Sequence, residues 1–250
     1  MKYTSVALVT GANQGIGLQI AKDLAAHGLT VLVGSRDFAK GKTAAESVGT
    51  DAHALQLDVT DAESISEAAA RIRREFGRLD VLVNNAGITH GGGPGLSLEE
   101  ILKSDRPSTV VMGDLRRVFE TNVFGVVAVT QAMLPLLRES PAGRVVNVSS
   151  TMGSLSMNAD PHFPYRSMLG VAYGPSKSAL NAITLAFATE LESTGIKVNS
   201  VCPGYTATAL NDFQGPRSVE QAAREPVRLA LLDADGPTGT FSNEDGPLAW

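Results

Sequence analysis

The chain has 250 residues, 43% of them hydrophobic and 19% charged, a composition typical of a folded domain that excludes a disordered chain. Its net charge of −5, with no cluster of lysine and arginine, argues against a nucleic-acid partner. The lone cysteine, Cys202, leaves no internal disulfide, and no apolar run approaches the roughly 20 residues that span a bilayer.

Residues 1–5 lead directly into a strand-like segment and lack the charged and apolar regions of a signal peptide. Together with the lone cysteine, this start favours a cytoplasmic protein in a reducing compartment. We therefore expect no membrane partner.

Short apolar runs alternate with longer helical patterns along the rest of the chain. The apolar runs predict strands at residues 6–9, 31–33, 54–57, 81–83, 145–148, 197–201 and 240–241. Apolar residues at helical spacing predict helices over residues 16–24, 65–76, 113–138 and 172–193, and another from about Ser218. Thr60 and Glu63 have the spacing of a capping box ahead of the second helix.

This alternation predicts the fold class. Strand, helix and strand in succession imply right-handed crossovers and an α/β, doubly wound (Rossmann-type) parallel sheet. We expect about seven strands with helices on both faces, in a single domain over residues 1–250. Three stretches without clear periodicity, at 88–112, 151–171 and 205–217, are predicted as loops. We expect them at the carboxyl edge of the sheet, where ligands bind in such folds.

A glycine-rich turn joins the first strand to the first helix, with glycines at 11, 15 and 17. Glycine permits a tight turn and a close backbone approach, and the amino end of the helix then offers free N–H groups to a phosphate. A plain strand–helix turn would show some of the same features, so this motif alone is only an indication of nucleotide binding.

Four motifs together are more specific: Thr10-Gly11-x-x-x-Gly15-x-Gly17, Asn84-Asn85-Ala86-Gly87, Tyr173-x-x-x-Lys177 and Pro203-Gly204. In their order and approximate spacing, they resemble the short-chain dehydrogenase/reductase family over essentially the whole chain. The segments at 147–152 and 228–250 further resemble the carbonyl reductase branch of that family. The resemblance implies an oxidoreductase that uses NAD(P)H and acts on a small-molecule carbonyl substrate.

The resemblance also implies where the cofactor lies. Asn84 would steady the central strands, and either Thr206 or Thr208 would meet the nicotinamide amide. The implied cofactor-binding residues are Gly11, Asn13, Gln14, Gly15, Ile16, Gly17, Arg36, Asp58, Val59, Asn85, Ala86, Gly87, Tyr173, Lys177, Pro203, Gly204, Thr206 and Thr208.

The end of the second strand bears on the choice between NADPH and NADH. NAD-specific sites place a carboxylate there, on the adenosine ribose hydroxyls. This chain has neutral Ser35 at the corresponding position, followed by Arg36, whose guanidinium suits the 2′-phosphate of NADPH. We therefore expect NADPH, although Asp37 would reach the ribose if the register shifted by one residue.

Tyr173 and Lys177 are four residues apart, so a helix places both on one face. A nearby ammonium favours the phenolate, which would bring the tyrosine pKa closer to neutral pH for acid–base work. By resemblance, Tyr173 donates the proton, Lys177 also binds the ribose, Ser150 orients the substrate oxygen and Asn122 belongs to a proton relay. Ser149 is the alternative to Ser150.

Other functions receive less support. The four histidines are scattered without a ligand pattern, so no catalytic metal is predicted. Ser149 and Ser150 lack the elbow motif of a serine esterase. Two alternatives stay open: alcohol oxidation by the same residues, and a non-catalytic NADP-sensing protein. Neither the substrate nor the choice between monomer and homo-oligomer follows from the sequence.

Overall fold

Within residues 4–92 and 96–250, which the computed structural model describes, eight strands form one sheet. Their order across the sheet is β3-β2-β1-β4-β5-β6-β7-β8. The bounds are β1 Val6–Val9, β2 Thr30–Ser35, β3 Ala52–Gln56, β4 Val81–Asn84, β5 Arg144–Val148, β6 Lys197–Val201, β7 Phe241–Asn243 and β8 Gly246–Pro247. Strands β1 to β7 pair in parallel, which confirms the predicted doubly wound α/β sheet. The short β8 was not predicted and pairs antiparallel with β7.

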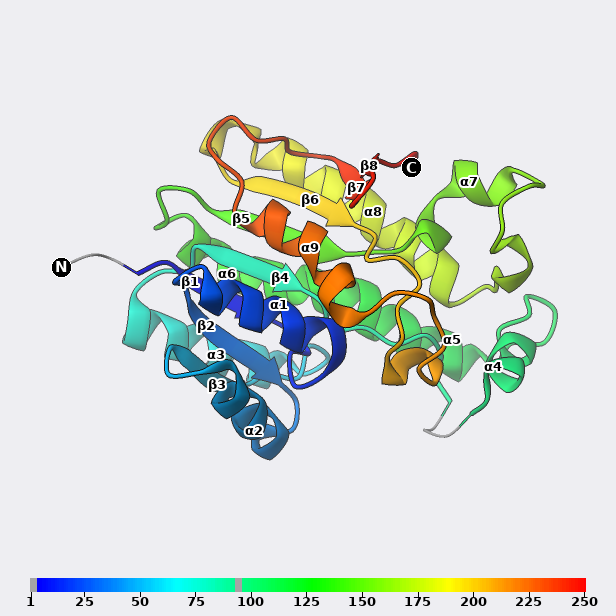
Figure 1. Cartoon of the computed structure of the whole chain (residues 1–250), viewed down its shortest axis with the longest axis horizontal. Coiled ribbons are helices and arrows are strands. Elements are labelled where there is room, and N and C mark those ends of the chain that lie inside the picture. Colours follow the sequence, from blue (N-terminus) through cyan, green and yellow to red (C-terminus); the bar gives the residue numbers. More distant parts are fainter. Residues whose placement is uncertain (1–3, 93–95) are drawn as a thin grey trace.

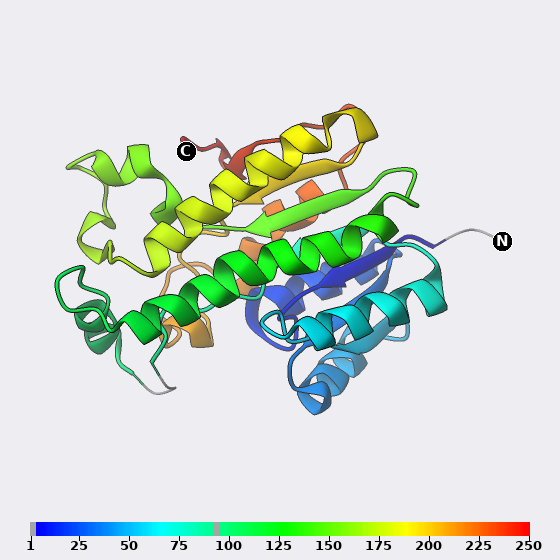
Figure 2. The ribbon, with the colours of Figure 1, turned by 180° about the vertical axis from the view of Figure 1, so that it is seen from behind.

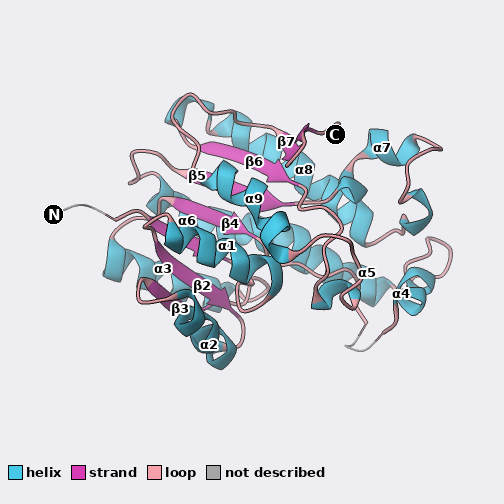
Figure 3. Ribbon diagram, viewed as in Figure 1, coloured by secondary structure: helices cyan, strands magenta, loops and turns pink. Residues whose placement is uncertain are grey.

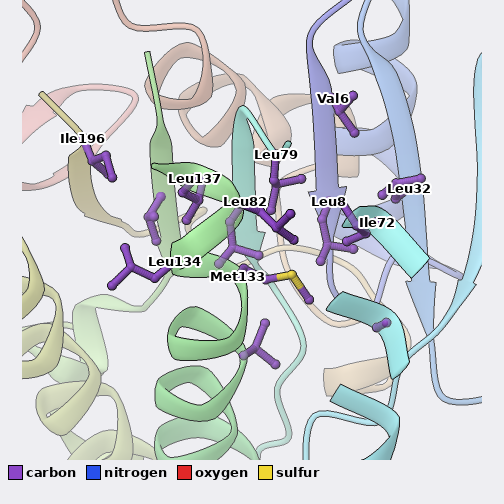
Figure 4. Close-up of a cluster of buried hydrophobic side chains, with 14 of the residues drawn as sticks. Val6, Leu8, Leu32, Ile72, Leu79, Leu82, Met133, Leu134, Leu137 and Ile196 are labelled. Carbon is purple, nitrogen blue, oxygen red and sulfur yellow. The ribbon is translucent and has the colours of Figure 1, made fainter. Parts of the chain in front are cut away.

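Helices cover both faces of this sheet (Figures 1 and 2). One face carries α1 (Gly15–Ala26), α2 (Phe38–Val48) and α9 (Val219–Ala230), and the other carries α3 (Ala62–Phe76), α6 (Gly125–Leu137) and α8 (Tyr173–Glu190). Because both faces are covered, the central strands are apolar throughout: Val6 and Leu8 of β1 join one core cluster, and Ala7 and Val9 join the other. Figure 4 shows the first cluster, where Met133 of α6 lies among side chains of the sheet and α3.

Three local features differ from the sequence prediction. Helix α3 is capped by Asp61, whose carboxylate accepts from the N–H of Glu63 at 2.9 Å, while the Thr60 hydroxyl donates to Asp58 instead. The N-cap of α3 is therefore Asp61, one residue after the predicted Thr60. Strand β3 begins two residues before the predicted start at 54, and ends at Gln56. Helix α2 was missed because its buried residues, Gly41, Ala44 and Ala45, are too small to form an apolar stripe.

The two long helices are present with changes at their ends. The predicted helix over 113–138 is a continuous run of α5 (Met112–Phe119), a π-helical turn (Glu120–Phe124) and α6. Among the described residues, this run alone is long and apolar enough to cross a membrane by length and composition, and more than half of its apolar stretch is buried inside the protein. The helix predicted over 172–193 is α8, followed by a short 3-10 turn.

The three predicted loops lie together beyond the carboxyl ends of the strands, where Figure 1 shows the arrowheads pointing toward α4 (Leu98–Ser104), α5 and α7 (Leu155–Ala159). They are less irregular than expected: the first contains α4 (Leu98–Ser104), and the second α7 (Leu155–Ala159), as Figure 3 shows. The third contains a 3-10 turn at Ala209–Asn211. Residues 93–95 of the first stretch lie outside the described residues.

Candidate active site

The glycine turn between β1 and α1 has the backbone that its sequence predicts. Gly11 and Gly15 have φ angles of +62° and +59°, in the left-handed region that favours glycine. A Cβ at Gly11 would lie 2.9 Å from Cα of Ala86, and one at Gly17 would collide with the Asn85 side chain. The turn therefore packs directly against the segment after β4.

The start of α1 is open to an anion. Its N-cap residue, Gln14, makes no side-chain capping hydrogen bond, and its first turn contains no acidic residue. The first N–H groups of the helix are thus available to a phosphate, as the sequence predicts. Asn13 and Ile16 flank this start and are partly buried.

Thr10 ties the glycine turn to the Asn85-Ala86 segment, and sequence reasoning assigned it no role. Its hydroxyl oxygen accepts from the backbone N–H groups of Asn85 and Ala86, both at 3.0 Å. The Asn85 side chain in turn donates to the carbonyls of Thr10 and Gly11, at 2.9 and 3.2 Å. The Asn85 side chain therefore holds the turn in place, which leaves its backbone to meet a ligand. Thr10 opens the glycine motif, so its position was visible in the sequence, although its contacts were not.

The end of β2 separates the two rival cofactor residues. The carboxylate of Asp37 caps α2, accepting from the N–H of Lys40 at 3.1 Å, and lies 3.8 Å from its ammonium. Arg36 is exposed at the carboxyl edge, with its carbonyl accepting from Gln56 at 2.7 Å. The hydroxyl of buried Ser35 donates to the Asp37 carbonyl. Of the two charged residues, Arg36 thus has the freer side chain.

Asp58 and Val59 follow β3 at the same edge of the sheet. The Asp58 carboxylate accepts from the N–H and hydroxyl of Thr60, at 2.9 and 2.7 Å. Val59 is partly buried, and its carbonyl lies so near Gly125 that a Cβ there would be 2.7 Å away. Both residues are where the sequence analysis expected them, on a turn between β3 and α3.

Asn84 belongs to a buried polar network across the centre of the sheet. Its side chain donates to Asn147 at 2.9 Å and to the Thr130 hydroxyl at 3.1 Å. Asn147 continues to Thr184 at 2.8 Å, so the network joins β4 and β5 to α6 and α8. This arrangement matches the structural role that the resemblance implies for Asn84.

Asn122 lies in the π-helical turn and is fully buried. Its carboxamide bonds both backbone groups of Ile88, accepting from the N–H at 2.9 Å and donating to the carbonyl at 2.8 Å. It also donates to the hydroxyl of Ser176 at 3.0 Å. A Cβ at Gly87 would lie 3.2 Å from Oδ1 of Asn122 and 3.6 Å from Nζ of Lys177, so these two side chains meet beside Gly87.

Tyr173 opens α8, one turn before the buried Lys177. The Lys177 ammonium lies 5.7 Å from the centre of the Tyr173 ring and donates to the Val148 carbonyl at 2.8 Å. Burial lowers the pKa of Lys177 to about 8. Burial also raises the pKa of Tyr173 to about 12, against the opposing effect of a hydrogen bond with the Ser150 side chain. The lowering of the tyrosine pKa that the sequence predicts is not found, because desolvation is the larger influence here.

The structure distinguishes the two serines. Ser150 is partly exposed, and its side chain lies near enough to the Tyr173 phenol to lower the pKa of that group. Ser149 is buried, and its hydroxyl donates to the Lys177 carbonyl at 3.4 Å. Only Ser150 is therefore placed to share a ligand with the phenol.

The segment after β6 completes the site. The hydroxyl of buried Thr206 donates to the Gly204 carbonyl at 3.1 Å, within its own turn. Thr208 is partly buried and faces the glycine turn, since a Cβ at Gly15 would lie 3.6 Å from its methyl group. Gly204 has a φ of +80° and follows Pro203. Of the two threonines, Thr208 is the one that the structure brings to the glycine turn.

These residues form one continuous strip along the carboxyl edge of the sheet, from the glycine turn past Ala86 and Gly87 to Lys177 and Tyr173. Cys202 is buried beside it, and burial raises the pKa of its thiol, which disfavours a nucleophilic role. Among residues 4–92 and 96–250, no three His, Cys, Asp or Glu side chains gather as metal ligands would.

The chain is similar to known proteins over almost its full length. A (−)-isopiperitenone reductase from Mentha piperita is 33% identical, with 97% of each chain covered. Carbonyl reductase [NADPH] 1 from Sus scrofa is 32% identical, covering 99% of this chain and 94% of the relative. The solved structure of an NADPH-bound carbonyl reductase from chicken fatty liver matches with a TM-score of 0.82, 27% identity and 99% of both chains covered.

The family model described as short chain dehydrogenase matches residues 5–217, which contain the glycine turn, Asn122, Ser150 and the Tyr173–Lys177 pair. With the relatives above and the parallel sheet, this match identifies an oxidoreductase of the alcohol–ketone type that uses a nicotinamide cofactor. The chain belongs to the short-chain dehydrogenase family, near its carbonyl reductase branch.

Proposed function

We propose that this protein is an NADPH-dependent carbonyl reductase that converts a ketone or aldehyde into an alcohol, with Tyr173 as the proton donor. The proposal depends above all on one observation: the Ser150 hydroxyl lies near enough to the Tyr173 phenol to lower its pKa, and the Lys177 ammonium lies 5.7 Å from the phenol ring. A carbonyl oxygen between these two hydroxyls would receive a hydrogen bond from each residue.

The bound cofactor would supply the hydride, and residues of this chain would donate the proton and replace it. With a pKa of about 12, the Tyr173 phenol keeps its proton at neutral pH, as a donor to a carbonyl oxygen must. The Ser150 hydroxyl orients that oxygen. The Lys177 ammonium stabilises the phenolate that is left after proton transfer, and it would also bind the ribose hydroxyls of the cofactor. Asn122, which lies near Gly87 as Lys177 does, would belong to the relay that returns a proton to Tyr173.

The glycine turn and the amino end of α1 would hold the cofactor phosphates, and Arg36 the 2′-phosphate that distinguishes NADPH from NADH. Support for Arg36 comes from Asp37, whose carboxylate is engaged in capping α2. Further support comes from the relatives whose names include NADPH. We also propose a cytoplasmic location, which microscopy of a tagged protein in its own cell would test.

The decisive experiment follows NADPH and NADH consumption by purified protein over a panel of aromatic ketones, diketones, quinones and aldehydes. We expect turnover with NADPH well above that with NADH. Tyr173→Phe removes one hydroxyl, so it should lower kcat by at least 100-fold while the dissociation constant of NADPH changes little. Ser167→Ala, an exposed hydroxyl in the 151–171 segment, is the matched control.

Two results would contradict the proposal. If Tyr173→Phe retained activity, the proton donor would be wrong. If the wild-type protein bound NADPH tightly but turned over no carbonyl in the panel or the corresponding alcohols with NADP⁺, the NADP-sensing alternative would replace it.

A further inference from the structure

Helix α8 begins at Tyr173 without a capping side chain of its own. Its N-cap residue, Ala172, has no side-chain oxygen, although the first N–H groups of any helix need acceptors outside the helix. These N–H groups lie at the very residue that the proposed function uses as the proton donor. The group that accepts hydrogen bonds from these N–H groups therefore helps to fix the position of the Tyr173 phenol.

The acceptor comes from a segment far away in sequence. The carboxylate of Asp105 accepts from the N–H of Ala172 at 2.7 Å, and the backbone N–H of Tyr173 lies near enough to lower its pKa. The carbonyl of Asp105 accepts from the N–H of Val171 at 2.9 Å. One residue thus receives hydrogen bonds from two successive backbone N–H groups, those of Val171 and Ala172, just before α8.

The surroundings of Asp105 are fitted to this contact. The residue is 8% exposed, and a Cβ at Gly170 would collide with its carboxylate, so the glycine permits the approach. Asp105 is also the C-cap of α4, where its N–H donates to Ile101 at 3.0 Å. The other end of α4 is fixed by a capping box of Ser97 and Glu100. A short capped helix therefore presents the carboxylate.

Burying a carboxylate is costly unless hydrogen bonds satisfy it. Burial raises the pKa of Asp105, while the backbone N–H groups of Ala172, Tyr173 and Val171 act in the opposite direction. A neutral side chain would fill the same space at lower cost. A carboxylate accepts strongly at both oxygens, and it also suits the positive end of a helix.

We propose that Asp105 is a positioning residue for the reaction: its carboxylate holds the first turn of α8 so that the Tyr173 phenol stays in reach of Ser150 and the substrate oxygen. The inference depends on the proposed role of Tyr173 as proton donor. It also gives the 88–112 segment a part in the chemistry, since α4 carries the residue that orients the phenol.

The test compares four variants with wild type: Asp105→Ala, Asp105→Asn, Gly170→Ala and, as control, Asp160→Ala. Asp160 is an exposed aspartate of the 151–171 segment, whose carboxylate accepts from the N–H of His162. For each we would measure kcat, KM, the NADPH dissociation constant, the melting temperature and the solvent deuterium isotope effect on kcat.

Asp105→Ala should lower kcat at least tenfold, leave NADPH affinity within twofold and raise the solvent isotope effect, because a displaced phenol slows proton transfer. Asp105→Asn keeps one acceptor oxygen and should recover part of the lost kcat. Gly170→Ala pushes the carboxylate away and should resemble Asp105→Ala. Asp160→Ala should match wild type.

The proposal is overturned if kcat and the isotope effect of Asp105→Asn and Gly170→Ala equal those of wild type. It is also overturned if kcat falls only in proportion to a loss of folded protein or of NADPH affinity. Should Asp105→Ala not fold, the other two variants decide. Failure of the proposed function is separate, because it shows as activity in Tyr173→Phe, whatever Asp105 does.

Discussion

Burial moves the pKa values of Tyr173 and Lys177 in opposite directions, since each side chain prefers its uncharged form away from water. For Tyr173 the uncharged form is the proton donor that reduction needs. For Lys177 the uncharged amine could not stabilise the phenolate of Tyr173, so the charged form is the one that reduction needs. The protein therefore buries an ammonium at neutral pH, with the Val148 carbonyl as its hydrogen-bond acceptor.

This buried charge predicts how stability depends on pH. The pKa of Lys177 is about 8 when folded and 10.5 in its ordinary environment, so the unfolded chain binds more protons between these values. Stability from this group should therefore rise with pH across that window, by about 3 kcal/mol in total. Lys177→Met removes the effect, so its advantage over wild type in urea unfolding should shrink steadily from pH 7.5 to 10. A pH-independent difference between the two proteins would show that the ammonium is not buried as described.

The choice of cofactor is also decided at single residues. Arg36→Ala removes the proposed partner of the 2′-phosphate, so the NADPH dissociation constant should rise at least tenfold while that of NADH changes little. Asp37→Asn is the matched control, because Asp37 caps α2 and should influence stability more than cofactor choice. A larger change in NADH affinity in Asp37→Asn than in Arg36→Ala would return the ribose contact to Asp37.

At the scale of elements, the polar network around Asn84 joins two strands to two helices, and its members lie within hydrogen-bond distance. Asn84→Ala leaves the Oδ1 of buried Asn147 without this donor, which should lower the free energy of unfolding by about 2 kcal/mol. Denaturant unfolding would measure the loss. Asn243→Ala, at the end of β7, removes only exposed hydrogen bonds to Asp245 in the next turn and should lose much less. An equal loss in both variants would mean that the network contributes nothing beyond an ordinary surface contact.

How well each element could be predicted depended on how clear a hydrophobic pattern its sequence contains. Strands covered on both faces are continuous apolar runs, so β1, β4, β5 and β6 lie close to their predicted bounds. Helix α2 buries only small residues and gave no such signal. The carboxylate of Asp105 binds the N–H of Ala172, which is 67 residues away in sequence, so no local sequence pattern could predict this contact. The family motifs located the glycine turn and the Tyr173–Lys177 pair, whereas burial, which decides their pKa values, required the structure.

At the scale of the whole molecule, contacts between residues far apart in sequence join the β8 edge of the sheet to the 151–171 segment. The ring of Trp250 stacks on Phe241 of β7, with ring centres 5.6 Å apart. The Trp250 carbonyl accepts from the hydroxyl of Ser156, at 2.7 Å, and from its N–H, at 3.1 Å. The last residues of the chain therefore bind both the sheet and the 151–171 segment, which contains α7.

These contacts allow the single-domain prediction to be tested with the chain's own tryptophan, the only one it has. Trp250 fluorescence reports the β8 edge, while far-ultraviolet circular dichroism reports all helices, including those beside β1 to β3. If residues 1–250 unfold as one unit, both signals should give the same denaturant midpoint. Saturating NADPH, which we propose binds along the carboxyl edge of the sheet, should raise both midpoints equally, and at 100 times its dissociation constant it should raise the free energy of unfolding by about 2.7 kcal/mol. An earlier fluorescence transition that NADPH leaves unchanged would mean that the β8 edge and α7 unfold apart from the cofactor site.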